Sequence, residues 1–174
     1  MTKHNDLTQS ILLFGDPRLS AQCKEVNPLD KSLIETGETL LRTIHAFRQV
    51  HGWGRAIAAP QVGVLERIVA MTINGKETVL LNPRITWHSP VSHELWDDCM
   101  SLPQIAVRVL RLKSVTVEYT TLDGTDAAFE RAGEDLSELL QHEIDHLDGV
   151  LMTDRQVSST PLIARKNREI ADLT

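Results

Sequence analysis

Apolar residues recur at helical spacing in two stretches of the chain, one early and one late. The first runs to His51 from Asp30, a residue type that favours the N-cap, and Gly52 follows it as a C-terminal cap. The second begins at Asp135, another candidate cap, and ends at Gly149. Two amphipathic helices are therefore predicted. Their apolar positions are Leu33, Ile34, Leu40, Leu41, Ile44 and Phe47 in the first and Leu136, Leu139, Leu140, Ile144 and Leu147 in the second.

Between the two helical stretches the chain predicts short strands separated by turns. Residues 67–73 and 77–81 form two strand candidates joined by Asn74-Gly75, a strong hairpin signal, and Asn82-Pro83 is expected to end the second. A block of strands between one early and one late helix favours an α+β fold over alternating strands and helices. Weaker patterns predict further strands at residues 84–87, 91–96, 107–112, 114–119 and 127–131.

The two ends of the chain carry weaker patterns. Residues 10–14 are a short apolar run that Gly15-Asp16-Pro17 stops, as expected of an extended arm or strand that follows an N-terminal arm of residues 1–9. In the C-terminal tail, residues 158–174, the sequence Ser159-Thr160-Pro161 predicts the start of a short surface helix. Because repeats and linkers are lacking, residues 1–174 are expected to form a single domain.

Composition narrows the class of protein. The chain has 174 residues, 41% of them hydrophobic, and its formal charge of −6 argues against specific nucleic acid and anionic membranes as main partners. It contains no apolar run long enough to span a membrane and no signal or transit peptide pattern, so a cytoplasmic protein is expected. Two cysteines are too few for a disulfide framework. Cys23, with no histidine nearby in the sequence, is predicted to be a small buried apolar side chain.

Metal-binding chemistry is concentrated in the late helix. His142 and His146 are four residues apart and project from one face, so their imidazoles could take two sites on a divalent cation. Glu143 could reach a water on that cation, as in a hydrolase. The plain alternative is a helix with two structural histidines. A catalytic site also needs a third ligand, and Cys99, in an irregular stretch bounded by Pro103, could supply a thiolate.

Three motifs in one order resemble the peptide deformylase family. Residues 54–61 resemble the family's Gly-x-Gly-x-Ala-Ala-x-Gln loop, residues 97–101 its Glu-Gly-Cys-Leu-Ser segment, and residues 142–146 its His-Glu-x-x-His helix motif. The resemblance extends over roughly residues 10–154. It implies an α+β fold in which antiparallel strands wrap around a central metal-binding helix, with the earlier long helix packed alongside.

The resemblance also implies an activity, the metal-dependent hydrolysis of the formyl group from N-formylmethionyl peptides of nascent proteins. Cys99, His142 and His146 would bind one divalent metal ion, with Fe²⁺ favoured over Zn²⁺ or Ni²⁺. Glu143 would be the general base. N-formylated peptides or nascent chains are then the expected partners. Contact with the ribosome is compatible with this role, and the oligomeric state is left open.

Two further groups would face the formyl oxygen as it gains negative charge, the side-chain amide of Gln61 and the backbone N–H of Met100. Four positions depart from the family motifs. Ala56 replaces a glycine, Asp97 and Asp98 replace Glu-Gly, and Met100 replaces a leucine. None of these changes removes a ligand, the base or Gln61, so the chemistry is expected to be intact while the binding surface is altered.

The pocket for the first side chain of the substrate differs from the family pattern more than the three motifs do. The family lines it with apolar residues, whereas the matching positions here include Arg55, within the first motif, and Asp135, about two turns before His142. A charged pair is therefore expected at this pocket. The alternatives are that Asp135 only caps the helix and that Arg55 points to solvent. The residues implied for the pocket are Gly54, Arg55, Ala56, Ile57, Leu95, Asp135 and Leu139.

Other functions remain open on the sequence. One is a deformylase-like amidase that prefers a different first side chain or N-acyl group. Another is a non-catalytic relative that keeps the metal for structure, and a third is a metalloprotease with the same helix motif. Glu143 argues against the structural role, because a structural site needs no base. Cys99 argues against the protease, whose third ligand is usually histidine or glutamate.

Overall fold

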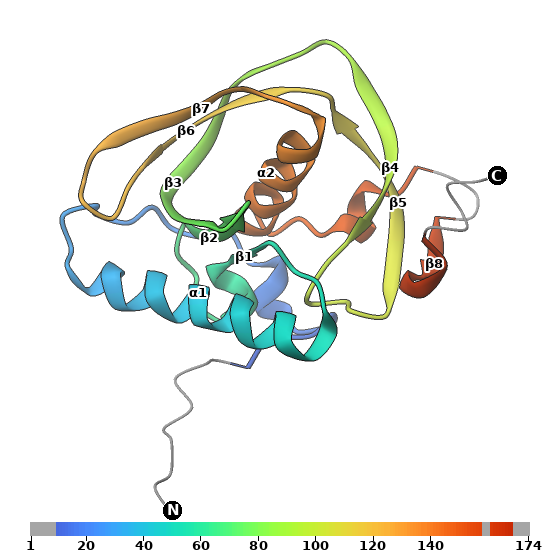
Figure 1. The fold of residues 1–174 in the computed structure, drawn as a ribbon, viewed down its shortest axis with the longest axis horizontal. Helices are drawn as coiled ribbons and strands as arrows, with labels where there is room; N and C mark the ends of the chain where they lie inside the picture. Colours follow the sequence, from blue (N-terminus) through green and yellow to red (C-terminus); the bar gives the residue numbers. More distant parts are fainter. Residues whose placement is uncertain (1–9, 158–160, 169–174) are drawn as a thin grey trace, which may run out of the picture.

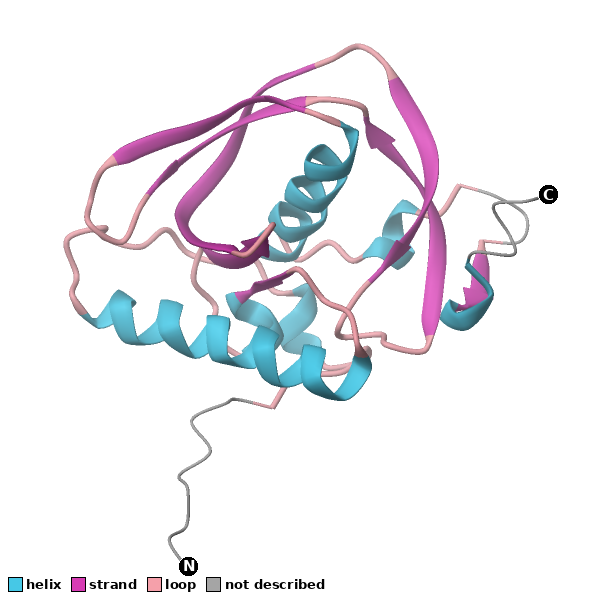
Figure 2. Ribbon diagram, in the orientation of Figure 1, coloured by secondary structure: helices cyan, strands magenta, loops and turns pink. Residues whose placement is uncertain are grey.

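A central helix, α2 (Glu134–Leu147), is surrounded by antiparallel strands (Figure 1). The computed structural model describes residues 10–157 and 161–168. Within them the strands form one sheet in the order β1-β2-β3-β6-β7 and a second in the order β4-β5-β8. The long helix α1 (Ser32–His51) packs beside the first sheet, so the predicted α+β fold is confirmed (Figure 2). The strands are β1 (Ala56–Ala58), β2 (Ile68–Ile73), β3 (Lys76–His88), β4 (Ser92–Asp98), β5 (Ile105–Leu112), β6 (Val115–Thr120), β7 (Asp126–Ala132) and β8 (Leu162–Ala164), and the short 3-10 helices are η1 (Pro17–Ser20), η2 (Ala59–Val62), η3 (Met152–Arg155) and η4 (Arg165–Asn167).

Strands β1 and β2 of the larger sheet are buried on both faces, and successive side chains along them point to opposite faces. In β2, Val69 and Met71 belong to the cluster around α2, whereas Ile68 and Ala70 belong to the cluster around α1. Each helix contributes the apolar stripe that the sequence predicts. The α2 stripe supplies Leu139, Leu140, Ile144 and Leu147, and the α1 stripe supplies Leu33, Leu40, Ile44 and Phe47. The metal-binding motif on α2 therefore lies between two layers of strands.

The Asn74-Gly75 hairpin is confirmed, because both residues have the positive φ of a type I′ turn, 51° and 78°. The prediction that Asn82-Pro83 ends the following strand is wrong. β3 continues to His88, and its register against β6 shifts between Leu81 and Arg84. Proline has no N–H to donate to a ladder, and a bulge accommodates it without ending the strand. The Asn82 side chain fixes this bulge through two 2.8 Å hydrogen bonds with the backbone of Val26.

The predicted helix caps are confirmed only in part. Gly52 ends α1 with a φ of 75°, as expected, and Asp30 accepts a 2.9 Å hydrogen bond from the Ser32 N–H although Lys31 occupies the N-cap. Asp135 does not cap α2. The N-cap is Gly133, and Asp135 lies inside the first turn, where a carboxylate still favours the positive end of the helix dipole.

The described segments nearest the two ends of the chain, residues 10–14 and 161–168, both pack on the body of the protein. Residues 10–14 form the predicted extended arm, which donates from Leu12 N to Gln61 O at 2.7 Å and from Phe14 N to Ser101 O at 2.9 Å. The helix predicted for the C-terminal tail is wrong for the described part of the tail. Residues 162–164 form β8 on the edge of β5, whose backbone groups are available as partners, and the 3-10 turn η4 and the helical residue Arg168 follow. The N-terminal arm 1–9 and tail residues 158–160 and 169–174 lie outside the described residues.

The strand predicted at residues 84–87 is the second half of β3, and the strands predicted at residues 91–96, 107–112, 114–119 and 127–131 occur with ends that differ by at most two residues. Cys23 is buried in the α2 cluster, as predicted, and burial raises the pKa of its thiol to about 11. Neither α1 nor α2, the two α-helices of the described residues, is long and apolar enough to cross a membrane.

Candidate metal centre

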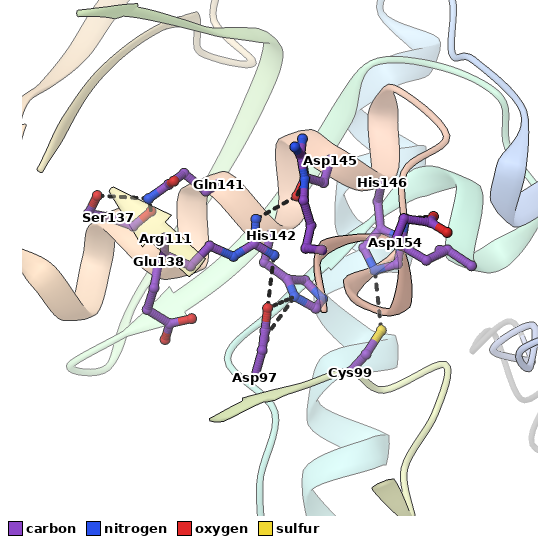
Figure 3. Close-up of polar contacts among 12 residues, drawn as sticks. Asp97, Cys99, Arg111, Ser137, Glu138, Gln141, His142, Asp145, His146 and Asp154 are labelled. Atoms are coloured by element: carbon purple, nitrogen blue, oxygen red, sulfur yellow. Dashed lines mark hydrogen bonds and ion pairs between the residues drawn. The ribbon is translucent and has the colours of Figure 1, made fainter. Parts of the chain in front are cut away.

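Cys99, His142 and His146 converge in the interior of the protein (Figure 3). One possible ligand atom from each residue lies within 4.8 Å of the others, and all three side chains are at most 5% exposed. The histidines come from adjacent turns of α2 with ring centroids 4.9 Å apart, and Cys99 follows directly after β4. The Cys99 sulfur lies 3.2 Å from Nε2 of His146. The three predicted metal ligands are therefore brought together at one point.

Asp97 fixes the orientation of His142. Its carboxylate lies 2.9 Å from Nδ1 of the imidazole, and an ionised carboxylate can only accept, so Nδ1 donates to Asp97 and Nε2 is the nitrogen left to face a cation. Burial would raise the pKa of Asp97, but His142 and Arg111 hold it well below its usual range. Burial lowers the pKa of His146 well below its usual range, and the neighbouring His142 acts in the same direction. His146 therefore has a lone pair for a cation. Burial would lower the pKa of His142 as well, but Asp97 raises it well above its usual range, so a cation that binds Nε2 of His142 must displace a proton.

Asp97 belongs to an ion network that also contains Arg111, Asp145 and Arg155. The sequence did not predict this network. Arg111, 3% exposed, donates at 2.8 Å to Asp97 and at 2.5 Å to Asp145, and Arg155 donates to Asp145 at 2.7 Å (Figure 3). A signal for Arg111 does exist in the sequence. It lies on β5 in alternation with Val107 and Val109, so an inward-facing position carries an arginine and requires buried carboxylates as partners.

Replacing Asp97 by alanine is expected to weaken metal binding by about 10- to 100-fold, because the orienting partner of His142 is lost. The same change leaves Arg111 short of one buried partner and should lower the free energy of unfolding by about 3–5 kcal/mol. Metal dissociation constants and urea unfolding curves measure the two effects. Glu94→Ala on the same strand, which breaks an exposed pair with Arg108, is the control. Unchanged metal affinity in Asp97→Ala would contradict the orienting role.

Glu143 is buried beside the ligands with unused hydrogen-bonding capacity. It is 3% exposed, and its Oε2 atom has no hydrogen-bond partner among the described residues. Burial raises the pKa of Glu143 to about 7, although His142 opposes that shift. A buried carboxylate oxygen without a partner is costly unless a bound molecule satisfies it. A thiolate, two imidazoles and this free oxygen fit a divalent metal of the zinc or ferrous iron type with one open position.

Gln61 is held in one orientation next to Cys99. Its Oε1 atom accepts from the Ala58 N–H at 2.9 Å, so its amide nitrogen points to Ser101 Oγ at 3.1 Å and to the Cys99 sulfur at 3.6 Å. Met100 is buried beside it. Gly54 has a φ of 112°, and a Cβ there would meet the Met100 sulfur at 2.8 Å, so this position favours glycine. The two residues predicted to face the formyl oxygen, Gln61 and Met100, therefore both lie next to Cys99.

A cavity of about 420 Å³ opens next to these groups. The predicted pocket residues Ile57 and Leu95 do not line it, which corrects two of the pocket assignments. β1 alternates, so Ala56 lines the cavity while Ile57 turns to the α1 cluster, and Leu95 packs instead against the cluster that contains Cys99. Of the remaining predicted residues, Gly54, Arg55, Ala56, Gln61, Cys99, Met100, Asp135, Leu139, His142 and Glu143 line the cavity, together with the unpredicted Arg48, Trp53, Trp96, Glu138, Arg165 and Arg168.

The charged pair predicted at the pocket is present, and a third member joins it. Arg55 donates from Nη1 to Asp135 at 2.7 Å and from Nη2 to Glu138 at 2.5 Å. Neither alternative holds, since Asp135 does not cap the helix and Arg55 is engaged in ion pairs. Glu138 was missed by the sequence reasoning, although it lies one turn before His142 and therefore on the same face of α2. We call these three residues the charged bridge.

The described part of the C-terminal tail closes one side of the same cavity. Arg165 and Arg168 both donate to Asp98, at 3.1 and 2.7 Å, and the Arg165 guanidinium stacks over Trp53 at 3.8 Å. These contacts tie the segment after β8 to β4, immediately before Cys99. Asp98, one of the departures from the family motif, thus anchors the tail.

Comparisons with known proteins find relatives over most of the chain. Residues 8–161 match the model of a family described as polypeptide deformylase. A peptide deformylase of Thermotoga neapolitana is 35% identical over 156 residues, 90% of this chain and 92% of the relative. One of Pseudothermotoga lettingae is 36% identical over 161 residues, 92% of this chain and 90% of the relative. The crystal structure of peptide deformylase from Thermotoga maritima superimposes with a TM-score of 0.79 at 32% identity, covering 87% of this chain and 99% of that one. The structure from Synechococcus elongatus in complex with actinonin gives 0.80 at 29% identity over 87% and 80% of the two chains.

Proposed function

The chain belongs to the polypeptide deformylase family, and we propose that Cys99, His142 and His146 hold one divalent metal with which it removes the formyl group from N-formylmethionyl peptides. The observation that carries this proposal is the convergence of those three ligands beside Glu143, whose Oε2 atom has no partner within the described residues. A purely structural metal site would need neither that free carboxylate nor the adjoining cavity.

Fe²⁺ is the metal we favour, with Zn²⁺ and Ni²⁺ as alternatives, because a thiolate and two imidazoles suit all three ions. When bound, such an ion polarises the formyl oxygen and lowers the pKa of a water molecule. The orientation of His142 by Asp97 and the burial of Cys99 favour capture of the ion by this site. We further propose that the protein acts in the cytoplasm on nascent chains, where contact with the ribosome would bring the substrate.

Glu143 is the proton carrier in this proposal. Its carboxylate accepts a proton from the attacking water as the oxygen of that water bonds to the formyl carbon. It then returns the proton to the amide nitrogen as the carbon–nitrogen bond breaks, so the products are formate and a free amino terminus. The free Oε2 atom of Glu143 is the group available for this transfer.

Gln61 and the backbone N–H of Met100 are assigned to the developing charge on the formyl oxygen. Gln61 suits this role because its carbonyl oxygen is tied to the Ala58 N–H, which leaves only its amide N–H groups to face the site. Such donors act in a water-poor interior, and Gln61 is 1% exposed. Their contribution is therefore larger than that of a hydrogen bond in water.

Replacing Gln61 by alanine is expected to lower kcat by about 10²–10³-fold while the metal content stays unchanged, because a donor to the transition state is lost and no ligand is. Steady-state kinetics and metal analysis of the same sample measure both quantities. Ser101→Ala, which removes only a hydrogen-bond partner of Gln61, serves as the milder comparison. A decrease in kcat of less than tenfold in Gln61→Ala would show that Gln61 is not a catalytic group.

Turnover of formyl-Met-Ala-type peptides by anaerobically purified, iron-loaded protein tests the proposed function. We expect release of formate and of the free amine in equal amounts, and no hydrolysis of the N-acetyl-Met-Ala analogue at a comparable rate. Cleavage of the Met-Ala bond instead would indicate a protease. The absence of formate from metal-loaded protein would refute the proposal.

A further inference from the structure

We propose that the subsite for the first side chain of the substrate prefers a polar, hydrogen-bonding side chain on an apolar stem, such as glutamine, over an apolar side chain of equal length. This inference rests on the proposed deformylase function and specifies its substrate class. The charged bridge of Arg55, Asp135 and Glu138 carries it.

The position of the bridge follows from the geometry of the centre. In an N-formyl peptide the first Cα lies only two bonds from the formyl carbon, so its side chain begins close to the metal ligands. Glu138 precedes His142 by four residues, and side chains so spaced on a helix are direct neighbours about 5–6 Å apart. Arg55 reaches Glu138 from the loop before β1, and both line the cavity. A side chain that enters beside His142 therefore meets this wall.

The bridge carries unbalanced charge and unused acceptors. One guanidinium faces two carboxylates, so these three residues together carry a net charge of −1. Glu138 is the inner member, with a side chain 13% exposed against 81% for Asp135, and among the described residues only its Oε1 atom has a hydrogen-bond partner. The free Oε2 atom can accept from an amide, hydroxyl or ammonium group of the substrate.

One apolar residue of α2 also contributes to the wall. Leu139, next to Glu138 on α2, lines the cavity and can cover the methylene groups of an entering side chain. A purely apolar side chain would displace water from the bridge without replacing its hydrogen bonds. A substrate that cannot form hydrogen bonds leaves the buried polar groups of such a subsite unpaired. Its kcat/KM is therefore lower than that of the matching polar substrate by about tenfold or more.

The experiment compares formyl-Gln-Ala with formyl-norleucyl-Ala, whose side chains match in length and differ in polarity, and uses formyl-Met-Ala as the reference. With metal-loaded native protein we expect kcat/KM for the glutamine peptide to exceed that for the norleucine peptide by about tenfold or more. In the double variant Arg55→Met, Glu138→Leu the ratio should fall at least tenfold, because the wall loses its guanidinium and its inner carboxylate. Arg84→Met, Glu118→Leu removes an exposed ion pair between β3 and β6 and is the matched control, with an unchanged ratio expected.

Each outcome decides the question. Should the double variant not fold, Glu138→Gln keeps the shape of the side chain and removes its charge, and the ratio must then fall at least threefold. A native protein that prefers norleucine, or a ratio that the variants leave unchanged, would overturn the subsite while turnover of formyl-Met-Ala leaves the proposed function intact. Failure to hydrolyse any of the three formyl peptides would overturn both.

Discussion

The Glu143→Ala variant is expected to bind the metal at full stoichiometry and to lose about 10²–10⁴-fold in kcat, the usual contribution of a general base. The three ligands come from other side chains, so the substitution leaves the metal site complete. It removes the buried carboxylate whose Oε2 atom lacks a partner among the described residues. Metal analysis and formate release from the same preparation separate the two effects.

Two further variants show whether the loss belongs to proton transfer. Glu143→Gln keeps the size of the side chain but cannot take up a proton, so it should lose nearly as much activity as the alanine variant. Glu134→Gln lies on the first turn of the same helix, where its carboxylate pairs with Lys113 on the surface, and it should retain normal activity. A loss of less than tenfold in both Glu143 variants would mean that another group is the base.

Replacing Cys99 by alanine is expected to abolish stoichiometric metal binding and, with it, all measurable deformylation. The thiolate is the charged ligand of the trio, and two imidazoles on one helix are fewer protein ligands than a catalytic site of this type uses. Metal content after loading and gel filtration, measured beside formate release, gives the result directly.

The second cysteine provides a matched control for that experiment. Cys23 is also buried, but burial raises the pKa of its thiol to about 11, so it stays protonated, and it lies in the apolar cluster around α2. Cys23→Ala should therefore keep one metal per chain and full activity. Full occupancy in Cys99→Ala, or loss of the metal in Cys23→Ala, would contradict the assignment of the ligands.

Local patterns in the sequence were enough to predict the parts of the site that lie on one helix. The spacing of His142 and His146 and the apolar stripe around them define one buried face of α2, and the structure has both. The Asn74-Gly75 hairpin was predictable for the same reason, since only two adjacent residues determine the turn. Cys99 was a candidate third ligand from its residue type alone, and the family resemblance then assigned it to the metal together with the histidines.

Contacts between distant segments could not be predicted in the same way. Asp135 has the residue type of a helix cap, and only the family resemblance indicated its pairing with Arg55, which depends on how the loop before β1 meets α2. β3 passes through Asn82-Pro83 because Val26, far away in the sequence, provides hydrogen bonds to Asn82. The described part of the tail forms β8 instead of a helix because the edge of β5 is available to it. In each case a tertiary partner outweighs the local preference.

The most direct test of the central claim is a titration of metal-free protein with Fe²⁺ under anaerobic conditions, with bound metal and formate release from formyl-Met-Ala measured at each step. Activity should rise in proportion to the bound metal and reach its maximum at one ion per chain, and Cys99→Ala should show neither binding nor turnover. Formate release that does not depend on metal, or one tightly bound ion per chain without any release of formate, would contradict the account.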